Sequence, residues 1–240
     1  MPSIKFKNRA VAFIDILGFK SIVNAAEQSE SKLVELEQLI DILENAIPEF
    51  DEMVDERIPK ELIPKYIYIS DSIILSAPLT SSEMPRYRGL TILVMRIIQL
   101  SHVLLSKGYL IRGGVSVGSV WHTDSNIIGA AYQDAYQIEA KTLVPRVELS
   151  PSAKEYWDKS ESNLNTMCRE YKNHFMVNTL HDYYIKDESS DAARRAFDKY
   201  ACVIEGNLKA DHPEAVRYKW WWFKEYLESE VKGNPFIRCA

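Results

Sequence analysis

The chain has 240 residues, 46% of them hydrophobic and 26% charged, which is enough for one large domain or two small ones. Its formal net charge of −5 argues against a nucleic-acid-binding surface, although a local positive site could hold a nucleotide. The three cysteines are far apart and lack CxxC spacing, which favours reduced thiols. The N-terminus has no signal-peptide stretch, and the apolar segment 90–105 suits a buried helix better than a membrane span. We therefore expect a cytoplasmic protein without membrane insertion or a nucleic-acid partner.

Hydrophobic periodicity and glycine and proline positions predict the elements of the first 150 residues. In chain order we expect a strand at 11–15, a helix through 33–43 ended by Pro48, a hairpin over 66–77 with Asp71 and Ser72 at its turn, an apolar helix over 88–107 capped by Gly108, a strand over 109–120, a helix over 129–141 and a short strand at 146–150. This order is that of the ferredoxin-like split βαβ unit, so we expect an α+β fold with a mixed or antiparallel sheet. Two glycines inside one strand, Gly113 and Gly114, indicate that a backbone or ligand comes close there.

The residues after 150 are more polar. We expect a helix over 154–170, a strand near His174 and charged helix over 187–232. The aromatic cluster at 220–223 is expected to pack a C-terminal helix onto the core. The predicted organisation is a catalytic-type core over 1–150 and a helical extension over 151–240.

Two aspartates interrupt apolar strands. Asp15 ends the run AVAFID and Asp71 follows YIYIS, and neither strand carries a neighbouring Lys or Arg that would neutralise them. A buried carboxylate is costly unless it is paired or bound to a metal. Each could also be a plain turn former, as a helix cap at Asp15 or a hairpin turn at Asp71. If the strands are adjacent, the two carboxylates meet at one end and suit Mg²⁺ or Mn²⁺ with substrate phosphates.

The segment after Asp15 favours the metal interpretation. It runs from a strand end into a helix, Gly18 permits close backbone approach, and Lys20 falls in the first helical turn. Free N–H groups at a helix N-terminus form an anion site. A metal ligand directly before such a turn predicts binding of a metal–triphosphate complex.

Four segments together resemble the catalytic fold of class III nucleotidyl cyclases. They are AFIDILGFK, YISDSIILSAP, YLIRGGVSVG and IIGAAYQDAYQIEAK, which span roughly residues 9–150 in the order of that family. The resemblance implies two metals, Mn²⁺ or Mg²⁺, held by Asp15 and Asp71 with the Ile16 carbonyl as an extra ligand. It also implies a triphosphate over the segment Ile16, Leu17, Gly18, Phe19 and Lys20.

The chain departs from the family in the helix that supplies transition-state groups. Gln133 stands at the usual asparagine and Gln137 at the usual arginine, and a glutamine stabilises developing phosphoryl charge poorly. Arg112, Arg146 or Lys20 could substitute, and Arg112 is our candidate for catalysis. Otherwise the chain is catalytically weak.

The position of the purine-reading lysine is also changed. Ile67 occupies it, flanked by Tyr66 and Tyr68, so ATP and GTP lose support as substrates. This combination is similar to the pyrimidine cyclases of bacterial anti-phage defence, the Pycsar systems. That resemblance implies conversion of UTP or CTP to the 3′,5′-cyclic nucleotide, a homodimer with interfacial active sites, and a downstream effector activated by the product. Tyr66 and Tyr68 are the candidates for contacting the base, with Gln133 and Gln137 as further substrate-binding residues.

Two other functions stay open. DILGFKSIVN faintly resembles the opening of diguanylate cyclases, but their GGDEF signature is absent. A non-enzymatic dimerisation or nucleotide-sensing module would tolerate the two glutamines. Among the remaining polar residues, His102 is expected to be a satisfied core residue and Glu139 a capping or solvated helix residue. His122 is expected to be an ordinary loop histidine, with contact to ligand as the alternative.

Overall fold

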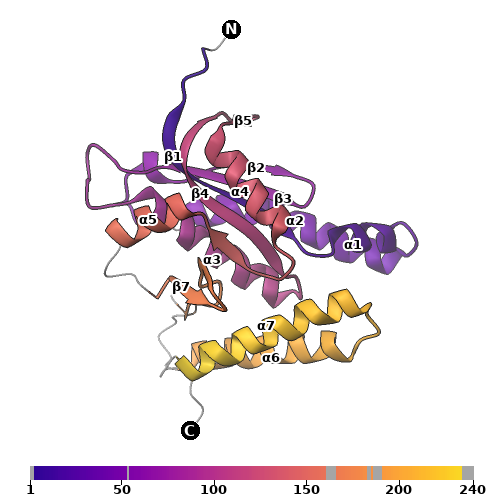
Figure 1. Ribbon diagram of the computed structural model, residues 1–240. Coiled ribbons are helices and arrows are strands. Elements are labelled where there is room, and N and C mark those ends of the chain that lie inside the picture. Colours follow the sequence, from indigo (N-terminus) through magenta and orange to yellow (C-terminus); the bar gives the residue numbers. More distant parts are fainter. Residues whose placement is uncertain (1–2, 53, 161–165, 183–184, 186–190, 234–240) are drawn as a thin grey trace.

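The structure is a computed structural model that describes residues 3–52, 54–160, 166–182, 185 and 191–233 (Figure 1). The described residues form an eight-stranded mixed sheet in the order β2-β3-β1-β4-β6-β8-β7, with β5 paired to the end of β4. The strands are β1 (Lys7–Ile16), β2 (Lys65–Ile69), β3 (Ser72–Pro78), β4 (Ile111–His122), β5 (Ile127–Ile128), β6 (Val147–Leu149), β7 (Cys168–Tyr171) and β8 (His174–Val177). Strands β4 and β6 are parallel, and the other pairs are antiparallel.

Helices cover both faces of this sheet. They are α1 (Phe19–Ala26), α2 (Glu30–Glu52), α3 (Gly89–Ser106), α4 (Ala130–Lys141), α5 (Pro151–Ser160), α6 (Ala192–Lys209) and α7 (Glu214–Gly233), with a short 3₁₀ turn at Lys60–Leu62. In Figure 1, α4 crosses the front of the sheet while α2 and α3 lie behind it. The α+β fold with a mixed sheet is therefore confirmed.

Strand β1 divides the core by alternation. Ala10, Ala12 and Ile14 face the α2–α3 side, while Val11 and Phe13 face α4. Asp15 continues the second set, so its position in the strand directs it to the α4 side at the end of the sheet. The apolar helix α3 is buried across most of its length, as its composition predicts, although by length and composition it could cross a membrane.

Close backbone packing explains the paired glycines of β4. A Cβ on Gly113 would lie 2.4 Å from the Phe13 carbonyl oxygen, and one on Gly114 would lie 2.3 Å from that of Ala135. The expected close approach is thus protein backbone on both sides, with α4 pressed onto β4. This contact places the C-terminal half of α4 beside the end of β1.

Two local predictions in the first half are wrong. Pro48 does not end its helix, because α2 continues to Glu52 and buries Ile47 and Phe50 in the core, which offsets the lost backbone hydrogen bond. The hairpin turn consists of Ser70 and Asp71, since Ile69 pairs with Ser72. Ser70 has a φ of +59°, the left-handed conformation that a two-residue hairpin turn requires.

The segment after residue 150 mixes strands and helices. The helix expected over 154–170 ends at Ser160, residues 161–165 lie outside the described residues, and β7 begins at Cys168. Strand β8 is confirmed near His174 and joins the central sheet through Glu148 and Met176. The charged region contains α6 and α7, while residues 187–190 lie outside the described part. The division at residue 150 stays a prediction.

Helices α6 and α7 form a hairpin below the sheet in Figure 1. Its core contains Trp220, Trp222 and Phe223, each at most 6% exposed, so the aromatic cluster packs as expected, although Trp221 is half exposed. The same cluster includes Leu110 and Val144 and contacts Leu17. The C-terminal helices therefore pack against the loops at one end of the sheet.

Candidate active site

Asp15 and Asp71 lie at the same end of neighbouring strands. Asp15 is opposite Ser72 in the β1–β3 register, so the β2–β3 turn stands beside the end of β1. The Ile16 amide donates a hydrogen bond to the Asp71 carbonyl oxygen over 3.2 Å. The structure thus brings the two predicted metal ligands together, and each carboxylate lies within electrostatic range of the other.

Arg112 is the counter-ion of this acidic group. It faces Asp15 across the β1–β4 pair, and its Nε donates to Asp15 Oδ2 over 2.9 Å. The same Nε lies 2.7 Å from Glu139 Oε1 on α4, and Nη1 donates to the Thr142 carbonyl oxygen over 3.0 Å. Arg112 therefore joins β1, β4 and the C-terminal end of α4.

Glu139 is not the solvated helix residue that the sequence suggested. Its helical position places it on the buried side of α4, where it is 5% exposed and ion-paired to Arg112. Its Oε1 oxygen is buried, and its contact with Arg112 Nε is an ion pair that lacks hydrogen-bond geometry. The site therefore contains a third carboxylate, and its Oε1 oxygen is ion-paired with Arg112.

The electrostatics of Asp15 follow from this crowding. Burial raises the pKa of Asp15 to about 7, Arg112 opposes that rise, and the charges of Asp71 and Glu139 add to it. The pKa of Glu139 is raised as well, first by burial, while Arg112 lowers it. Three carboxylates near one contacting guanidinium therefore form a site with excess negative charge.

A second cation approaches from the C-terminal hairpin. Lys219 of α7 is half-buried, and its pKa is lowered by burial and by the charge of Arg112, whereas Asp15 raises it. Leu17, directly beyond Ile16, packs against the apolar cluster to which this hairpin contributes, and its amide donates to the Leu110 carbonyl oxygen over 2.9 Å. The α6–α7 hairpin thus adds positive charge close to Asp15.

The residues present fit a divalent cation in part. Asp15, Asp71 and Glu139 supply the hard oxygen donors that Mg²⁺ and Mn²⁺ prefer. In the described residues, however, no three His, Cys, Asp or Glu side chains form a complete metal-binding group. Part of the coordination would have to come from backbone, water or ligand oxygens, and Arg112 would have to release Asp15 Oδ2.

The loop after Asp15 has the expected geometry. Gly18 is exposed with a φ of +86° and is the N-cap of α1, and its carbonyl oxygen accepts from Ser21 and Ile22. Phe19 is buried and anchors the helix, whereas Lys20 is exposed. The first-turn N–H groups of α1 thus begin directly beside the carboxylates and can hold an anion.

Several predicted substrate residues lie elsewhere. Gln133 and Gln137 are on the exposed side of α4, away from the side that carries Glu139. Tyr66 and Tyr68 are half-buried and line a cavity of about 720 Å³ beside α2, while Ile67 packs on the α4 side. Burial and the charges of Glu44 and Asp71 raise the pKa of Tyr68.

Arg146 is not at the site either. Its Nε pairs with Glu148 over 3.0 Å, and Glu148 also contacts His174. Of the three cations considered as substitutes for the missing arginine, Arg112 alone has a direct contact with Asp15 among the described interactions.

The fold can now be compared with known proteins. No family model matches the sequence, and a comparison with curated proteins found no match. Among solved structures, the monomeric guanylyl cyclase domain of the RhoGC fusion protein from the aquatic fungus Blastocladiella emersonii is similar with a TM-score of 0.51 at 14% identity, over 74% of this chain and 98% of that one. The catalytic core of a rhodopsin-guanylyl cyclase with converted specificity, in complex with ATPalphaS, gives a TM-score of 0.50 at 15% identity over the same shares. The chain therefore shares the fold of these guanylyl cyclase domains.

The cyclase fold accounts for about three quarters of the chain. Since the solved domains are covered almost completely, the remaining quarter is additional to the shared fold. At these identities the likeness concerns the fold alone, and the chemistry rests on the site residues.

Sequence reasoning missed two residues of the site. The i, i+4 relation of Glu139 to Ala135, which packs against β4, was a signal that Glu139 faces inward. Lys219 had no comparable signal, because it lies about 200 residues beyond Asp15 and approaches through tertiary packing.

Proposed function

We propose that this chain is a nucleotidyl cyclase that converts a pyrimidine nucleoside triphosphate, UTP or CTP, to its 3′,5′-cyclic monophosphate and pyrophosphate. The observation that carries the proposal is the meeting of Asp15 and Asp71 at one end of a cyclase-type sheet, beside the Gly18 turn and the N-terminus of α1. Ile67 at the purine-reading position supports a pyrimidine.

The carboxylates would hold Mn²⁺ or Mg²⁺, two ions per site, with the Ile16 carbonyl as a further donor. Such ions, when bound, lower the pKa of the ribose 3′-hydroxyl and offset charge on the triphosphate. The protein's own part is positioning. The backbone hydrogen bond from the Ile16 amide to the Asp71 carbonyl oxygen holds Asp15 and Asp71 next to each other. The N-terminus of α1 would bind the phosphates.

Arg112 would change partners during this reaction. In the structure it neutralises Asp15 and Glu139. Released from those carboxylates, its guanidinium could contact the α-phosphoryl oxygens, whose negative charge it would stabilise. Lys219 is a second candidate for that charge, since it approaches the same group.

The remaining parts of the proposal concern partners. We infer a cytoplasmic homodimer in which Gln133, Gln137, Tyr66 and Tyr68 contact substrate across the interface, because the glutamines are exposed on α4 rather than directed at Asp15 of their own chain. The product would activate a separate effector in anti-phage defence.

Incubation of the purified protein with ATP, GTP, CTP or UTP and Mn²⁺, followed by mass spectrometry, tests the function. Cyclic product from UTP or CTP that exceeds purine product at least about tenfold is the expected result. Preference for ATP or GTP would refute the pyrimidine assignment. Absence of product from all four, in protein with a cooperative melting transition, would refute cyclase activity.

One observation favours a second candidate. Arg112 is ion-paired within the acidic site, and position 137 carries glutamine rather than arginine. A non-catalytic nucleotide-sensing module on this fold would therefore also suit the geometry. Binding of triphosphate without turnover in the same assay would select this alternative.

A further inference from the structure

A second polar site lies at the opposite end of β1. Its cavity of about 260 Å³ is lined by Lys5, Lys7, Arg9, Lys65, Val120, Trp121 and His122. Four of these seven residues are cationic and none is acidic, in a chain whose formal net charge is −5. Like charges around one cavity repel each other, so this grouping is unfavourable unless an anion is present.

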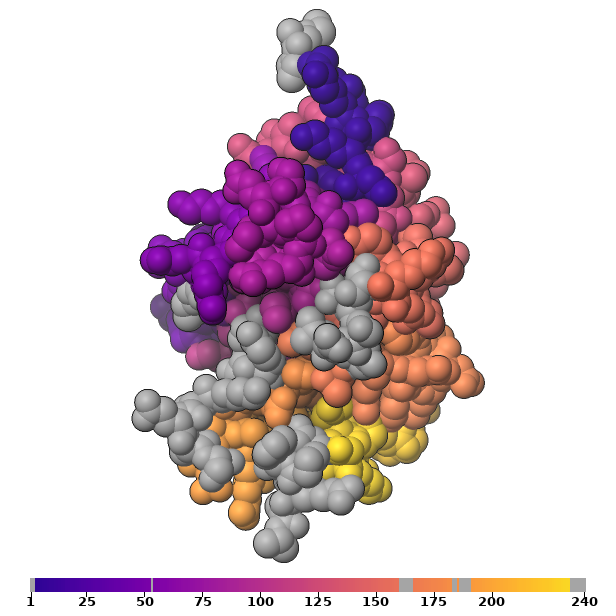
Figure 2. All heavy atoms as spheres, turned by 90° about the vertical axis from the view of Figure 1, so that its left-hand side faces the viewer, coloured from indigo at the N-terminus to yellow at the C-terminus, as the bar shows by residue number. Residues whose placement is uncertain are grey.

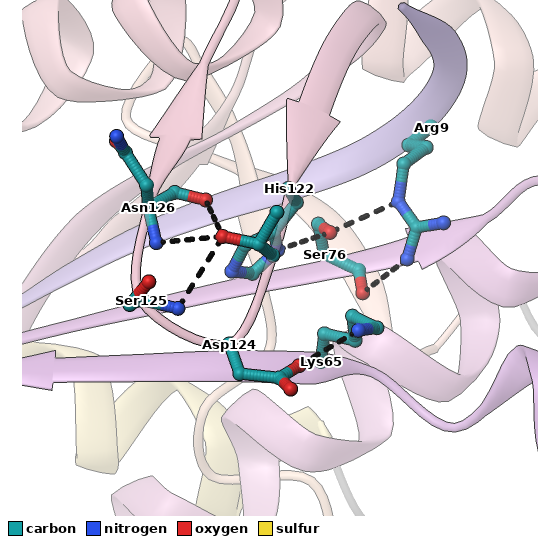
Figure 3. A network of polar contacts seen from close by, with 8 residues as sticks. Arg9, Lys65, Ser76, His122, Asp124, Ser125 and Asn126 are labelled. Carbon is teal, nitrogen blue, oxygen red and sulfur yellow. Dashed lines mark hydrogen bonds and ion pairs between the residues drawn. The ribbon is translucent and has the colours of Figure 1, made fainter. Parts of the chain in front are cut away.

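Arg9 has no acidic partner among the described residues. Its Nε donates to Ser76 Oγ and its Nη2 to the Ser76 carbonyl oxygen, both over 3.0 Å (Figure 3). Both acceptors are neutral, and burial lowers the pKa of Arg9. A half-buried guanidinium without a counter-ion is energetically costly. The planar guanidinium presents a fork of N–H donors that matches the oxygens of a phosphate group.

The hydrogen bonds continue from Ser76 to His122. Ser76 Oγ lies 2.6 Å from His122 Nδ1, and because Arg9 can only donate, the Ser76 proton is free to donate to that nitrogen. Burial, Arg9 and Lys65 lower the pKa of His122 to about 4, so the ring is neutral and carries its proton on Nε2. His122 Nε2 is buried and has no hydrogen-bond partner in the described structure. The network therefore ends in an unused donor.

The one acid of this network lies outside the cavity lining. Asp124 pairs with Lys65 over 2.8 Å, and its side chain is 96% exposed (Figure 3). Such an exposed pair contributes little, and it leaves Lys5, Lys7 and Arg9 without acidic partners among the described residues.

The cavity is separate from the acidic site. Five residues of extended β1 lie between Arg9 and Asp15, and the six steps along the strand span about 20 Å. Figure 2 shows the N-terminal segment and the C-terminal helices at opposite ends of the molecule. An anion held by Arg9 therefore cannot share cations held by Asp15.

We propose that Arg9, Lys5, Lys7, Lys65 and His122 form a second, metal-independent site for a small anion with one or two phosphate groups. The volume is below the roughly 300 Å³ at which pockets for whole drug-sized ligands begin, which favours phosphate groups over a complete nucleotide. The guanidinium and His122 Nε2 supply directed donors, and the lysines supply the surrounding charge.

Calorimetric titration with sodium pyrophosphate in EDTA at fixed ionic strength tests the site, with Asp71→Asn protein as the background so that the catalytic site does not contribute. Millimolar or tighter binding is expected, weakened at least about tenfold by Arg9→Gln and unchanged by Lys107→Gln, an exposed lysine far from the cavity. If Arg9→Gln impairs folding, the double variant Lys5→Gln/Lys7→Gln, whose side chains are exposed, serves instead and should weaken binding about fivefold or more.

A second experiment, with lipid vesicles, identifies the source of the phosphate group. Ile4 and Phe6 flank Lys5 and are each 54% exposed, so a lipid headgroup is the alternative to a free anion. Cosedimentation with phosphatidylglycerol vesicles that is lost in the Lys5→Gln/Lys7→Gln protein would assign a lipid source. Failure of both pyrophosphate and vesicles to bind, or binding that Arg9→Gln and the double variant leave intact, would overturn the proposal, whatever the outcome of the nucleotide assay.

Discussion

Arg112 lies directly across the β1–β4 pair from Asp15, and its Nε donates to Asp15 Oδ2 over 2.9 Å. The same guanidinium also pairs with Glu139. In the absence of other ions it is therefore the group that makes a buried cluster of carboxylates tolerable, in the position where divalent cations are proposed to act.

Replacing this cation should make stability depend on metal. Arg112→Met leaves Asp15 and Glu139 without their contacting cation, and we expect a loss of about 2 kcal/mol in the free energy of unfolding, measured by urea titration in EDTA. Added Mn²⁺ should restore most of it, since a divalent ion can neutralise the same oxygens. Arg217→Met, an exposed arginine on α7, is the control and should change little. An Arg112→Met protein that is as stable as the parent in EDTA would contradict the role of Arg112 as counter-ion.

Removing one carboxylate should lower turnover without lowering the stability of the fold. Asp71→Asn is expected to lower turnover at least about 100-fold, because a metal ligand is lost. Its melting temperature without metal should be unchanged or raised, since the repulsion between Asp71 and Asp15 is removed. Asp134→Asn, on the exposed side of α4, should retain activity. Unfolding of the Asp71→Asn protein would show that Asp71 is structural.

The contact between α4 and β4 can be tested with a single methyl group. Gly114→Ala would place a Cβ 2.3 Å from the Ala135 carbonyl oxygen and 2.7 Å from Ile138 Cβ, so α4 must move away from the sheet. We expect a loss of about 2–3 kcal/mol by denaturant titration. Gly206→Ala in α6 is the matched control: its added Cβ meets nothing within 4 Å, and it should stabilise by up to about 1 kcal/mol. Equal effects at both glycines would refute tight α4 packing.

His102 should make stability depend on pH. It is buried in α3, with Nδ1 2.8 Å from Tyr200 Oη and Nε2 2.9 Å from the His181 carbonyl oxygen. Burial lowers the pKa of His102 to about 4. Between pH 6.5 and pH 4 the unfolded chain binds the extra proton and the folded chain does not, so the stabilisation is complete above pH 6.5 and is lost as the pH falls.

The lowered pKa of His102 sets the size of this effect. At about 1.4 kcal/mol per pKa unit, the free energy of unfolding should fall by about 3 kcal/mol between pH 7 and pH 4. The difference in unfolding free energy between the parent and His102→Gln, measured at several pH values, isolates it from the other titrating groups. A difference that is constant from pH 7 to pH 4 would show that His102 is not the source.

The sequence predicted local elements well wherever the hydrophobic periodicity agreed with the positions of glycine and proline. The strand through Asp15, the hairpin and the Gly108 cap are all observed, and β1 extends further than expected. Errors arose where tertiary packing overrode a local signal. Pro48 lies inside α2 because burial of Ile47 and Phe50 in the core stabilises the helix beyond it. The hydrophobic periodicity of the sequence does not show that this stabilisation exceeds the cost of the N–H group that proline lacks.

The acidic site was only half visible in the sequence. The Asp15–Asp71 pair followed from strand order, because both residues end neighbouring strands. Glu139 and Lys219 join them through α4 and α7, and their positions depend on how each helix is rotated and packed, which no local pattern specifies. The basic cavity was missed for the same reason, since Arg9 and His122 come together only when β1 and β4 pair.

The packing of Leu17 against the apolar cluster that includes Trp220 has a consequence for synthesis. Trp220 leaves the ribosome about 200 residues after Leu17, so the loop that follows Asp15 gains its supporting surface only late in translation. Until then, the loop that follows Asp15 lacks part of the cluster against which Leu17 packs. Completion of the C-terminal hairpin is thus a timing step, after which the site takes its final form.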